Sequence, residues 1–280
     1  MSRVRSRERG TPRVVTRDAT KFLHKYGPWA VVAGASEGLG AAFARALAGR
    51  GLNLVLLARR EVALREVAAS LAGVEVKIAA LDLGAPDLAE RLQAATAGLD
   101  VGLCVYNAAA SHVGPFLARS LAEKQSILDV NCRGPLVAAH VFGERMVRRG
   151  RGGIVLMSSL TAFWGSPSIA TYGATKAFNL SLGEALWYEL GSQGVDVLAC
   201  CAGATRTPGF LRSLGGRRGP WSMAPDAVAE EALAALGGPP SMVPGLANKL
   251  ASQLLRRLLP RRSAVKIMGA ETAKLNRSPG

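Results

Sequence analysis

The stretch that decides the fold is residues 29–60, which read WAVVAGASEGLGAAFARALAGRGLNLVLLARR. Continuous apolar runs at 29–34 and 52–58 are typical of strands that are buried on both faces of a parallel sheet. Between them, at 41–50, apolar residues recur at spacings of three and four, which indicates a helix. The stretch therefore predicts a strand, a glycine-rich turn, a helix and a second, parallel strand.

The same alternation continues along the chain to about residue 240. A second helix is expected at 61–72. Further apolar runs predict four more strands, at residues 74–83, 101–107, 152–159 and 195–202. Since no Pro/Gly/Ser-rich linker or internal repeat divides this body, we expect one α/β domain over residues 26–240. It is a Rossmann-type doubly wound parallel sheet of about seven strands with helices on both faces.

The composition is that of a globular protein with an unevenly placed positive charge. Of the 280 residues, 49% are hydrophobic and 20% are charged, which excludes a disordered, collagen-like or disulfide-scaffold protein. The formal net charge of +15 is concentrated in a basic N-terminal extension, residues 1–25, and a basic, amphipathic C-terminal extension, residues 241–280. Such ends bind nucleic acid or an acidic membrane surface in some proteins, and in others they are solvated tails.

The glycine-rich turn after the first predicted strand is a candidate phosphate site. Glycines permit a tight turn and a close approach of the main chain to a pyrophosphate, and the helix that follows presents unpaired N–H groups. A strand before the turn and a helix after it favour a dinucleotide-binding site over a purely structural turn. The candidate residues are Gly34, Ser36, Gly38, Leu39 and Gly40.

The second predicted strand ends in Arg59 and Arg60, at the position where NAD-binding sites usually carry an acidic residue. A guanidinium group suits the 2′-phosphate of NADP, and the strand end itself carries no carboxylate before Glu61. We therefore predict NADP(H) rather than NAD(H) as the cofactor, with Arg59 ahead of Arg60. The alternative is a pair of surface arginines at the start of a helix.

Two further strand ends supply candidate cofactor residues. Asp82 either hydrogen-bonds the adenine amino group or caps the turn that follows it. Asn107 either joins neighbouring strand ends or contacts the ribose. Their neighbours Leu83 and Ala108 complete this part of the predicted cofactor site.

Tyr172 and Lys176 are spaced as YxxxK on a predicted helix, so that both side chains lie on one face. Ser159 ends the fifth predicted strand 13 residues before the tyrosine. Composition alone predicts only about 0.01 such matches. When a ketone is reduced, hydride adds to carbon and a proton adds to oxygen; a tyrosine can give that proton when a neighbouring ammonium stabilises its phenolate, and a serine hydroxyl can orient the carbonyl.

In these residues the chain resembles the short-chain dehydrogenase/reductase family. The resemblance covers residues 28–210 and is carried by AGASEGLG, YNAA, DVNCRGP, YxxxK and CAGATRTP. It implies that Tyr172 is the proton donor, that Lys176 binds the nicotinamide ribose and perturbs the tyrosine, and that Ser159 positions the substrate.

The resemblance also implies roles for residues that the spacing of the chain does not assign. Asn131, in DVNCRGP, matches the family's fourth catalytic residue, which holds a water in a proton relay to the lysine. Thr205 and Thr207 are expected to contact the nicotinamide amide. Family members are usually homodimers or tetramers.

Within the family, the chain is similar to the branch of very-long-chain 3-oxoacyl-CoA reductases and 17β-hydroxysteroid dehydrogenases, which use NADPH and take large apolar ketones. The similarity lies in YGPWAVVAGASEGLG, AGLDVGLCVYNAAAS and the basic C-terminal stretch. Two departures affect the nicotinamide pocket: the family's NNxG is replaced here by Tyr106-Asn107-Ala108-Ala109-Ala110, and its Pro-Gly after the sixth strand is replaced by Ala202-Gly203. The membrane-spanning N-terminal segment of eukaryotic relatives has no counterpart here, so we expect a bacterial, cytoplasmic member.

Two segments beyond the catalytic residues have open interpretations. Residues 208–223 combine glycines with large apolar side chains and are either a mobile lid over an apolar substrate or a surface loop. Residues 245–260 place four leucines on one helical stripe, which either packs into the core, closes the pocket or a subunit contact, or lies on an acidic membrane surface; the membrane contact would extend through residues 245–262. None of the three histidines is assigned to a metal, and no specific nucleic acid partner is predicted.

The sequence thus predicts an NADPH-dependent oxidoreductase. Its substrate is an apolar ketone, a secondary alcohol or a 3-oxoacyl thioester. The alternative is a non-catalytic NADP(H)-binding protein, involved in interaction or redox sensing, which docks on a membrane or nucleic acid through its basic ends.

Overall fold

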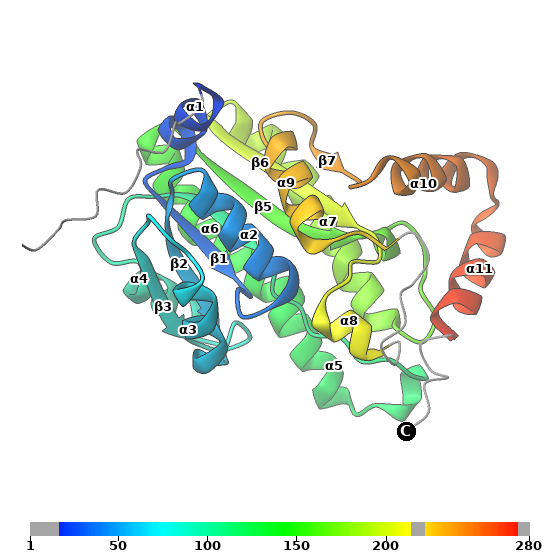
Figure 1. Ribbon diagram of the computed structural model, residues 1–280. Coiled ribbons are helices and arrows are strands. Elements are labelled where there is room, and N and C mark those ends of the chain that lie inside the picture. The colour runs from blue at the N-terminus through cyan, green and yellow to red at the C-terminus, as the bar shows by residue number, and fades with distance from the viewer. Residues whose placement is uncertain (1–16, 214–221, 274–280) are drawn as a thin grey trace, which may run out of the picture.

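The computed structural model describes residues 17–213 and 222–273. A single parallel sheet in the order β3-β2-β1-β4-β5-β6-β7 forms its centre, with helices on both faces (Figure 1). The strands are β1 (Trp29–Ala33), β2 (Asn53–Ala58), β3 (Val76–Ala80), β4 (Val101–Tyr106), β5 (Gly152–Ser159), β6 (Val195–Ala202) and β7 (Ser241–Met242). The strand order reverses between β1 and β4, and ligands bind at such a point in doubly wound folds. The predicted Rossmann-type fold is confirmed.

The strands are joined mostly by helices, as parallel strands require. The helices are α1 (Arg17–Tyr26), α2 (Gly38–Gly49), α3 (Glu61–Ala69), α4 (Leu88–Ala95), α5 (Leu121–Leu128), α6 (Gly134–Arg149), α7 (Ala170–Gly191), α8 (Pro208–Ser213), α9 (Pro225–Ala235), α10 (Leu246–Leu258) and α11 (Arg261–Ala273). Three short turns carry the labels η1 (Phe116–Ala118), η2 (Asp129–Arg133) and η3 (Leu160–Ala162). Of these, η2 is a π-helical turn that joins α5 to α6.

Two apolar cores lie on opposite faces of the sheet. Val32 of β1 packs into the core beneath α2 and α9, whereas its neighbour Val31 packs into the core beneath α4 and α6. Alternate side chains of a strand point to opposite faces, so a strand covered on both sides is apolar throughout. This is why the predicted runs are continuous rather than alternating.

The elements differ from the sequence prediction mainly at the sheet edges. The edge strand β3 is shorter than the predicted 74–83, and its residues are only partly buried. At the opposite edge, β7 pairs with β6 through two residues and lies within the stretch predicted as the C-terminal extension. Because edge strands have one neighbour, their apolar signal is weak.

The predicted boundary between residues 25 and 26 falls inside α1. Tyr26 is 4% exposed, and its hydroxyl donates a hydrogen bond of 2.5 Å to Asp196 Oδ2. Lys25 forms an ion pair with the same carboxylate. This helix is therefore part of the folded body. Within the described residues, every helix is too short or too polar to cross a bilayer.

Candidate active site

The glycine-rich turn leaves the end of β1 in a conformation that favours glycine. Gly34 has φ +82° and Gly38 has φ +57°. The turn is anchored to β2, because the N–H of Gly34 donates to the carbonyl of Leu57 at 2.7 Å. Glu37 precedes α2, but its side chain makes no capping hydrogen bond to this helix. The N-terminal N–H groups of α2 therefore have no side-chain cap and suit an anionic ligand.

Gly40 allows α2 to lie directly on the turn. A Cβ at this position would stand 1.9 Å from the Gly34 carbonyl oxygen and 2.9 Å from the Asn107 side-chain nitrogen. No side chain fits that space, so the helix and the turn touch through main chain alone. The turn has the shape that a pyrophosphate site requires.

Arg60 reaches the glycine-rich turn from the end of β2. Its Nη2 atom lies 3.2 Å from Ser36 Oγ and 3.0 Å from Glu37 Oε2. Arg212 of α8 pairs with the other oxygen of Glu37 at 3.2 Å. By contrast, Arg59 is exposed and has no ion-pair partner in the described part of the chain. It is thus Arg60, and not Arg59, that contacts the glycine-rich turn, whereas the sequence prediction placed Arg59 ahead of Arg60 for the cofactor.

The residues after β3 are divided between surface and core. Asp82 is exposed, and its Oδ1 accepts a hydrogen bond of 2.9 Å from the N–H of Gly84. The capping role that the sequence left open is therefore present. Leu83 is 5% exposed and belongs to a core, so that only its main chain can face a ligand.

Asn107 joins the ends of β1 and β4, which is one of the two roles predicted for it. Its side-chain nitrogen donates to the Gly34 carbonyl at 3.0 Å. The N–H groups of Asn107 and Ala108 both donate to the carbonyl of Ala33. The ends of β1 and β4 are thereby held together beneath the turn, and Ala108 would contact any side chain placed at Gly34.

Ser159, Tyr172 and Lys176 come together at the carboxyl edge of the sheet. Ser159 ends β5, and its hydroxyl oxygen accepts a hydrogen bond from the N–H of Thr161 at 3.2 Å, which leaves its own hydrogen free to donate. Tyr172 and Lys176 lie one turn apart on α7, with Lys176 Nζ 5.4 Å from the centre of the tyrosine ring. Ser158 points the other way and fastens α7 to β5 through the Lys176 carbonyl, at 2.7 Å.

Burial controls the pKa values of the two titratable catalytic candidates. Lys176 is 2% exposed, and its ammonium donates to the carbonyl of Met157 at 2.8 Å. Burial lowers the pKa of Lys176 to about 8. Burial also raises the pKa of Tyr172 above its ordinary value, and the hydrogen bond with Ser159 opposes this rise. The chain's own groups therefore do not produce the lowered tyrosine pKa that the sequence led us to expect from the neighbouring ammonium.

Asn131 lies fully buried in η2 and joins three segments. Its Oδ1 accepts from the N–H of Ala110 at 2.7 Å, and its Nδ2 donates to the Ala110 carbonyl at 2.9 Å and to Thr175 Oγ1 at 3.0 Å. The Thr175 hydroxyl in turn donates to the carbonyl of Tyr172 at 2.7 Å. The carbonyl oxygen and both amide hydrogens of Asn131 are thus used by the protein, so its side chain positions the site.

Tyr106 explains one departure from the family pattern. It is 1% exposed, and its hydroxyl donates to the carbonyl of Val130 in η2 at 2.7 Å. A Cβ at Gly134 would stand 1.9 Å from that hydroxyl. Gly134 and Thr175, which also support the catalytic candidates, were not singled out in the sequence analysis, and Tyr106 was noted there only as a departure from the family pattern. For Thr175 the available signal was its place inside the YxxxK spacing.

Thr205 and Thr207 lie at the base of the predicted lid. Thr207 adjoins the glycine-rich turn, because a Cβ at Gly38 would stand 2.9 Å from its side chain. Thr205 is largely buried and pairs with Met223, which returns from the lid segment. Residues 208–213 form α8, whereas residues 214–221 of the predicted lid lie outside the described residues.

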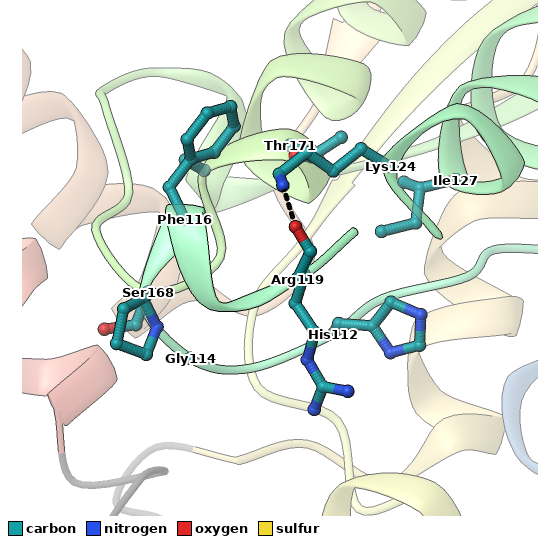
Figure 2. A pocket seen from close by; sticks show the side chains of 10 residues that line it. His112, Gly114, Phe116, Arg119, Lys124, Ile127, Ser168 and Thr171 are labelled. Atoms are coloured by element: carbon teal, nitrogen blue, oxygen red, sulfur yellow. Dashed lines mark hydrogen bonds between the residues drawn. The ribbon is translucent and has the colours of Figure 1, made fainter. Parts of the chain in front are cut away.

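A pocket lies beside the N-terminal turn of α7, which carries Tyr172 (Figure 2). Phe116 and Ile127 contribute apolar surface, and Lys124 lies 4.6 Å from the centre of the Phe116 ring. The dashed line in Figure 2 joins the Lys124 ammonium to the carbonyl of Arg119. The lining residues are His112, Gly114, Pro115, Phe116, Arg119, Lys124, Ile127, Ser168, Ala170 and Thr171.

Comparisons with proteins of known sequence agree with this geometry. A 7beta-hydroxysteroid dehydrogenase of Collinsella aerofaciens is 35% identical over 233 residues, which cover 80% of this chain and 89% of that protein. A very-long-chain 3-oxoacyl-CoA reductase of Podospora anserina is 40% identical over 186 residues, which cover 62% of this chain and 55% of that protein. The predicted resemblance to the short-chain dehydrogenase/reductase family is confirmed, and a very-long-chain 3-oxoacyl-CoA reductase is among the relatives.

Solved structures and a family profile point to the same group. A structure described as "Structural and biochemical insights into 7beta-hydroxysteroid dehydrogenase stereoselectivity" has a TM-score of 0.83 at 32% identity and covers 88% of this chain and 98% of its own. A short-chain dehydrogenase from Sphingobium yanoikuyae in complex with NADPH has a TM-score of 0.71 at 28% identity and covers 90% and 97%. The family profile described as short chain dehydrogenase matches residues 28–213. The chain therefore belongs to the short-chain dehydrogenase family of oxidoreductases.

Proposed function

We propose that the protein is an NADPH-dependent oxidoreductase that interconverts an apolar ketone, or a 3-oxoacyl thioester, and the corresponding alcohol. The observation that carries this proposal is the convergence of Ser159, Tyr172 and Lys176 at one strand end. When bound, the cofactor supplies the hydride for the carbonyl carbon and, once oxidised, a positive ring. Tyr172 gives its phenolic proton to the carbonyl oxygen, which the Ser159 hydroxyl orients by donating a hydrogen bond.

Lys176 and Asn131 support that proton transfer in different ways. An ammonium at Lys176 stabilises a phenolate at Tyr172 and binds the nicotinamide ribose. The proton relay that the family resemblance implies for Asn131 is retained as a proposal. Because its side chain is occupied, we assign the water-holding contact to the main chain of η2.

For the cofactor we propose NADP(H), with the 2′-phosphate held by Arg60, Ser36 and Arg59. The Arg60–Ser36 contact supports this choice, since one phosphate could accept from both groups at the head of α2. Fluorescence titration tests it. Arg60→Gln is expected to weaken NADPH binding about 10-fold and to leave NADH binding unchanged. Arg65→Gln, a nearby exposed arginine, is the matched control; equal losses for both cofactors would contradict the assignment.

For the substrate we propose a large apolar carbonyl compound. Relatives named for hydroxysteroids and for very-long-chain 3-oxoacyl-CoA support this class. The pocket beside the first turn of α7 offers apolar surface from Phe116 and Ile127 next to the basic side chains of Arg119 and Lys124. We propose a small-molecule substrate, a cytoplasmic location and a homodimeric or tetrameric assembly, as in the family. No comparable observation supports the non-catalytic NADP(H)-binding alternative. A protein that only binds the cofactor has no need of all four catalytic candidates.

Tyr172→Phe separates the two hypotheses. With a ketosteroid and a 3-oxoacyl thioester as probes, kcat is expected to fall at least about 100-fold, while NADPH affinity is retained. Tyr188→Phe is the matched control, because Tyr188 lies on the same helix and is 79% exposed. Full turnover by the Tyr172 variant would refute the mechanism. NADPH binding without turnover of any carbonyl probe by the parent protein would favour the non-catalytic alternative.

A further inference from the structure

Helix α10 has its polar side against the protein and its apolar side outward. Asn248 and Ser252 are 7% and 4% exposed. The leucine stripe, which follows the i, i+4 spacing along the other side of the helix, is 58–72% exposed and consists of Leu246, Leu250, Leu254 and Leu258. A helix that serves only the core of its own domain shows the opposite arrangement. The core packing that the sequence left open is therefore wrong for this stripe.

The inward side of α10 is held by specific contacts, so the outward stripe is not an accident of a loose end. Asn248 donates to the carbonyl of Pro244 at 3.3 Å and lies against Gly203, where a Cβ would stand 3.0 Å from its side-chain nitrogen. Further along the helix, the Arg256 guanidinium lies 4.4 Å from the centre of the Phe163 ring. These contacts fix the rotation of α10 about its axis and direct the leucines to solvent.

The surroundings of the stripe are strongly basic. On α10, Lys249 and Arg257 are exposed, and on α11 three further basic side chains are exposed: Arg261, Arg262 and Lys266. Between residues 246 and 273 the sequence contains one acidic residue, Glu271. A second copy of this chain would bring like charges together. An anionic surface instead complements them.

We propose that α10 lies in the surface of an anionic lipid bilayer, with the leucine stripe in the acyl region and the basic side chains at the head groups. At 13 residues the helix is about 20 Å long, and basic residues beside an apolar stripe are typical of interfacial helices. Long arginine and lysine side chains can extend from the apolar boundary to lipid phosphates. The proposal does not depend on the proposed enzymatic activity.

Docking in this way brings the segment after Ser159 close to the bilayer. Val265 of α11 lies 3.5 Å from the position of a Cβ at Gly165, and Pro167 lies 3.3 Å from that of a Cβ at Gly269. In Figure 1, α10 and α11 extend from the β7 edge of the sheet and border the carboxyl edge, where the catalytic candidates lie. An apolar substrate dissolved in the membrane would thus be near the site.

Vesicle sedimentation with the full chain tests the proposal. The protein is expected to bind phosphatidylcholine vesicles that contain about 30% phosphatidylglycerol at least about 10-fold more tightly than vesicles of phosphatidylcholine alone. Raising the salt to about 0.5 M should weaken that binding several-fold, because the Debye length becomes short. Equal binding to both vesicles, or none to either, would overturn the proposal.

Two sets of variants isolate the leucine stripe. Leu250→Ser with Leu254→Ser is expected to lower vesicle affinity at least about 10-fold. The control pair, Val62→Ser with Leu117→Ser, removes apolar side chains outside α10 that are more exposed than Leu250 and Leu254 and should bind as the parent does. Circular dichroism and NADPH titration verify that each variant is folded.

The oligomeric state distinguishes the competing occupant. If the parent is a dimer in sedimentation equilibrium, and the α10 pair makes it monomeric without changing vesicle binding, the stripe binds a second copy and the membrane proposal is refuted. Loss of vesicle binding with an unchanged oligomeric state is the expected result.

Discussion

Replacing Lys176 with methionine removes an ammonium whose burial lowers its pKa from 10.5 to about 8. Between these two pH values the unfolded chain keeps the lysine proton that the folded chain releases. The unfolded state therefore binds more protons, and the lysine adds stability as the pH rises through this window. As the pH falls from 10.5 to about 8, that contribution is lost.

The magnitude follows from the difference between the two pKa values. One pKa unit corresponds to about 1.36 kcal/mol, so the lysine adds about 2 kcal/mol to the free energy of unfolding between pH 7 and pH 9.5. Buried thiols act in the opposite direction, because burial raises the pKa of Cys104 to about 12 and that of Cys201 to about 11. The contribution of Cys104 is common to both proteins and cancels in the comparison of parent and variant. The charge of Lys176 lowers the pKa of Cys201, so the variant also changes the contribution of that thiol.

Urea unfolding of the parent and of Lys176→Met at pH 7 and pH 9.5 measures the effect. The parent's stability relative to the variant is expected to increase by about 2 kcal/mol over this range. The loss of the hydrogen bond to Met157 shifts the variant equally at both pH values. Lys266→Met, on the exposed side of α11, should follow the parent. A relative stability that stays constant within about 0.5 kcal/mol would refute the reasoning.

Three further substitutions test the framework of the site. Asn131→Asp removes both amide donors of a fully buried side chain and should cost about 3 kcal/mol of unfolding free energy in urea titration; a loss below about 1 kcal/mol would contradict the bridging role. Gly40→Ala places a Cβ 1.9 Å from the Gly34 carbonyl and should cost about 3 kcal/mol and weaken NADPH binding in fluorescence titration, whereas parent-like binding would show that the turn can relax. Tyr106→Phe leaves the Val130 carbonyl without its partner and should cost about 2 kcal/mol by urea unfolding, and an unchanged midpoint would count against that hydrogen bond.

Much of the fold could be predicted because its signals are local. The glycine-rich turn lies between an apolar run and an amphipathic stretch, and each of the six predicted strands corresponds to a strand of the sheet. The strand β7 was not located, because two residues that pair at an edge carry no periodicity. The start of α2 was placed three residues late, since glycines 38 and 40 have low helix propensity and are retained for their fit against the turn.

The part of the candidate site that could be predicted is the part in which a short spacing in the sequence places residues close together in space. The YxxxK spacing and the strand end at Ser159 are of this kind. The π-turn η2 could not be predicted in this way. The Tyr106 hydroxyl donates a hydrogen bond to the Val130 carbonyl of this turn, and the two residues are 24 positions apart in the sequence. Which of Arg59 and Arg60 contacts the glycine-rich turn could not be predicted. It depends on the direction in which each side chain leaves the end of β2, and the sequence does not determine that direction. The sequence predicts that the four leucines share one side of a helix. It does not predict that this side faces solvent, because that outcome depends on the packing of Asn248 and Ser252 against the rest of the protein.

The bridge at Asn131 also bears on how the molecule assembles during folding. Its bond to Thr175 spans 44 positions of the chain, and the bond from Asn107 to Gly34 spans 73. Large loops must close before such bonds form, whereas helices such as α7 need only near neighbours. A refolding chain therefore regains its helical signal well before the catalytic groups are in register. Turnover returns only when the segments that carry Asn131, Thr175, Asn107 and Gly34 have packed together. The time course of recovered activity therefore measures the final step of folding.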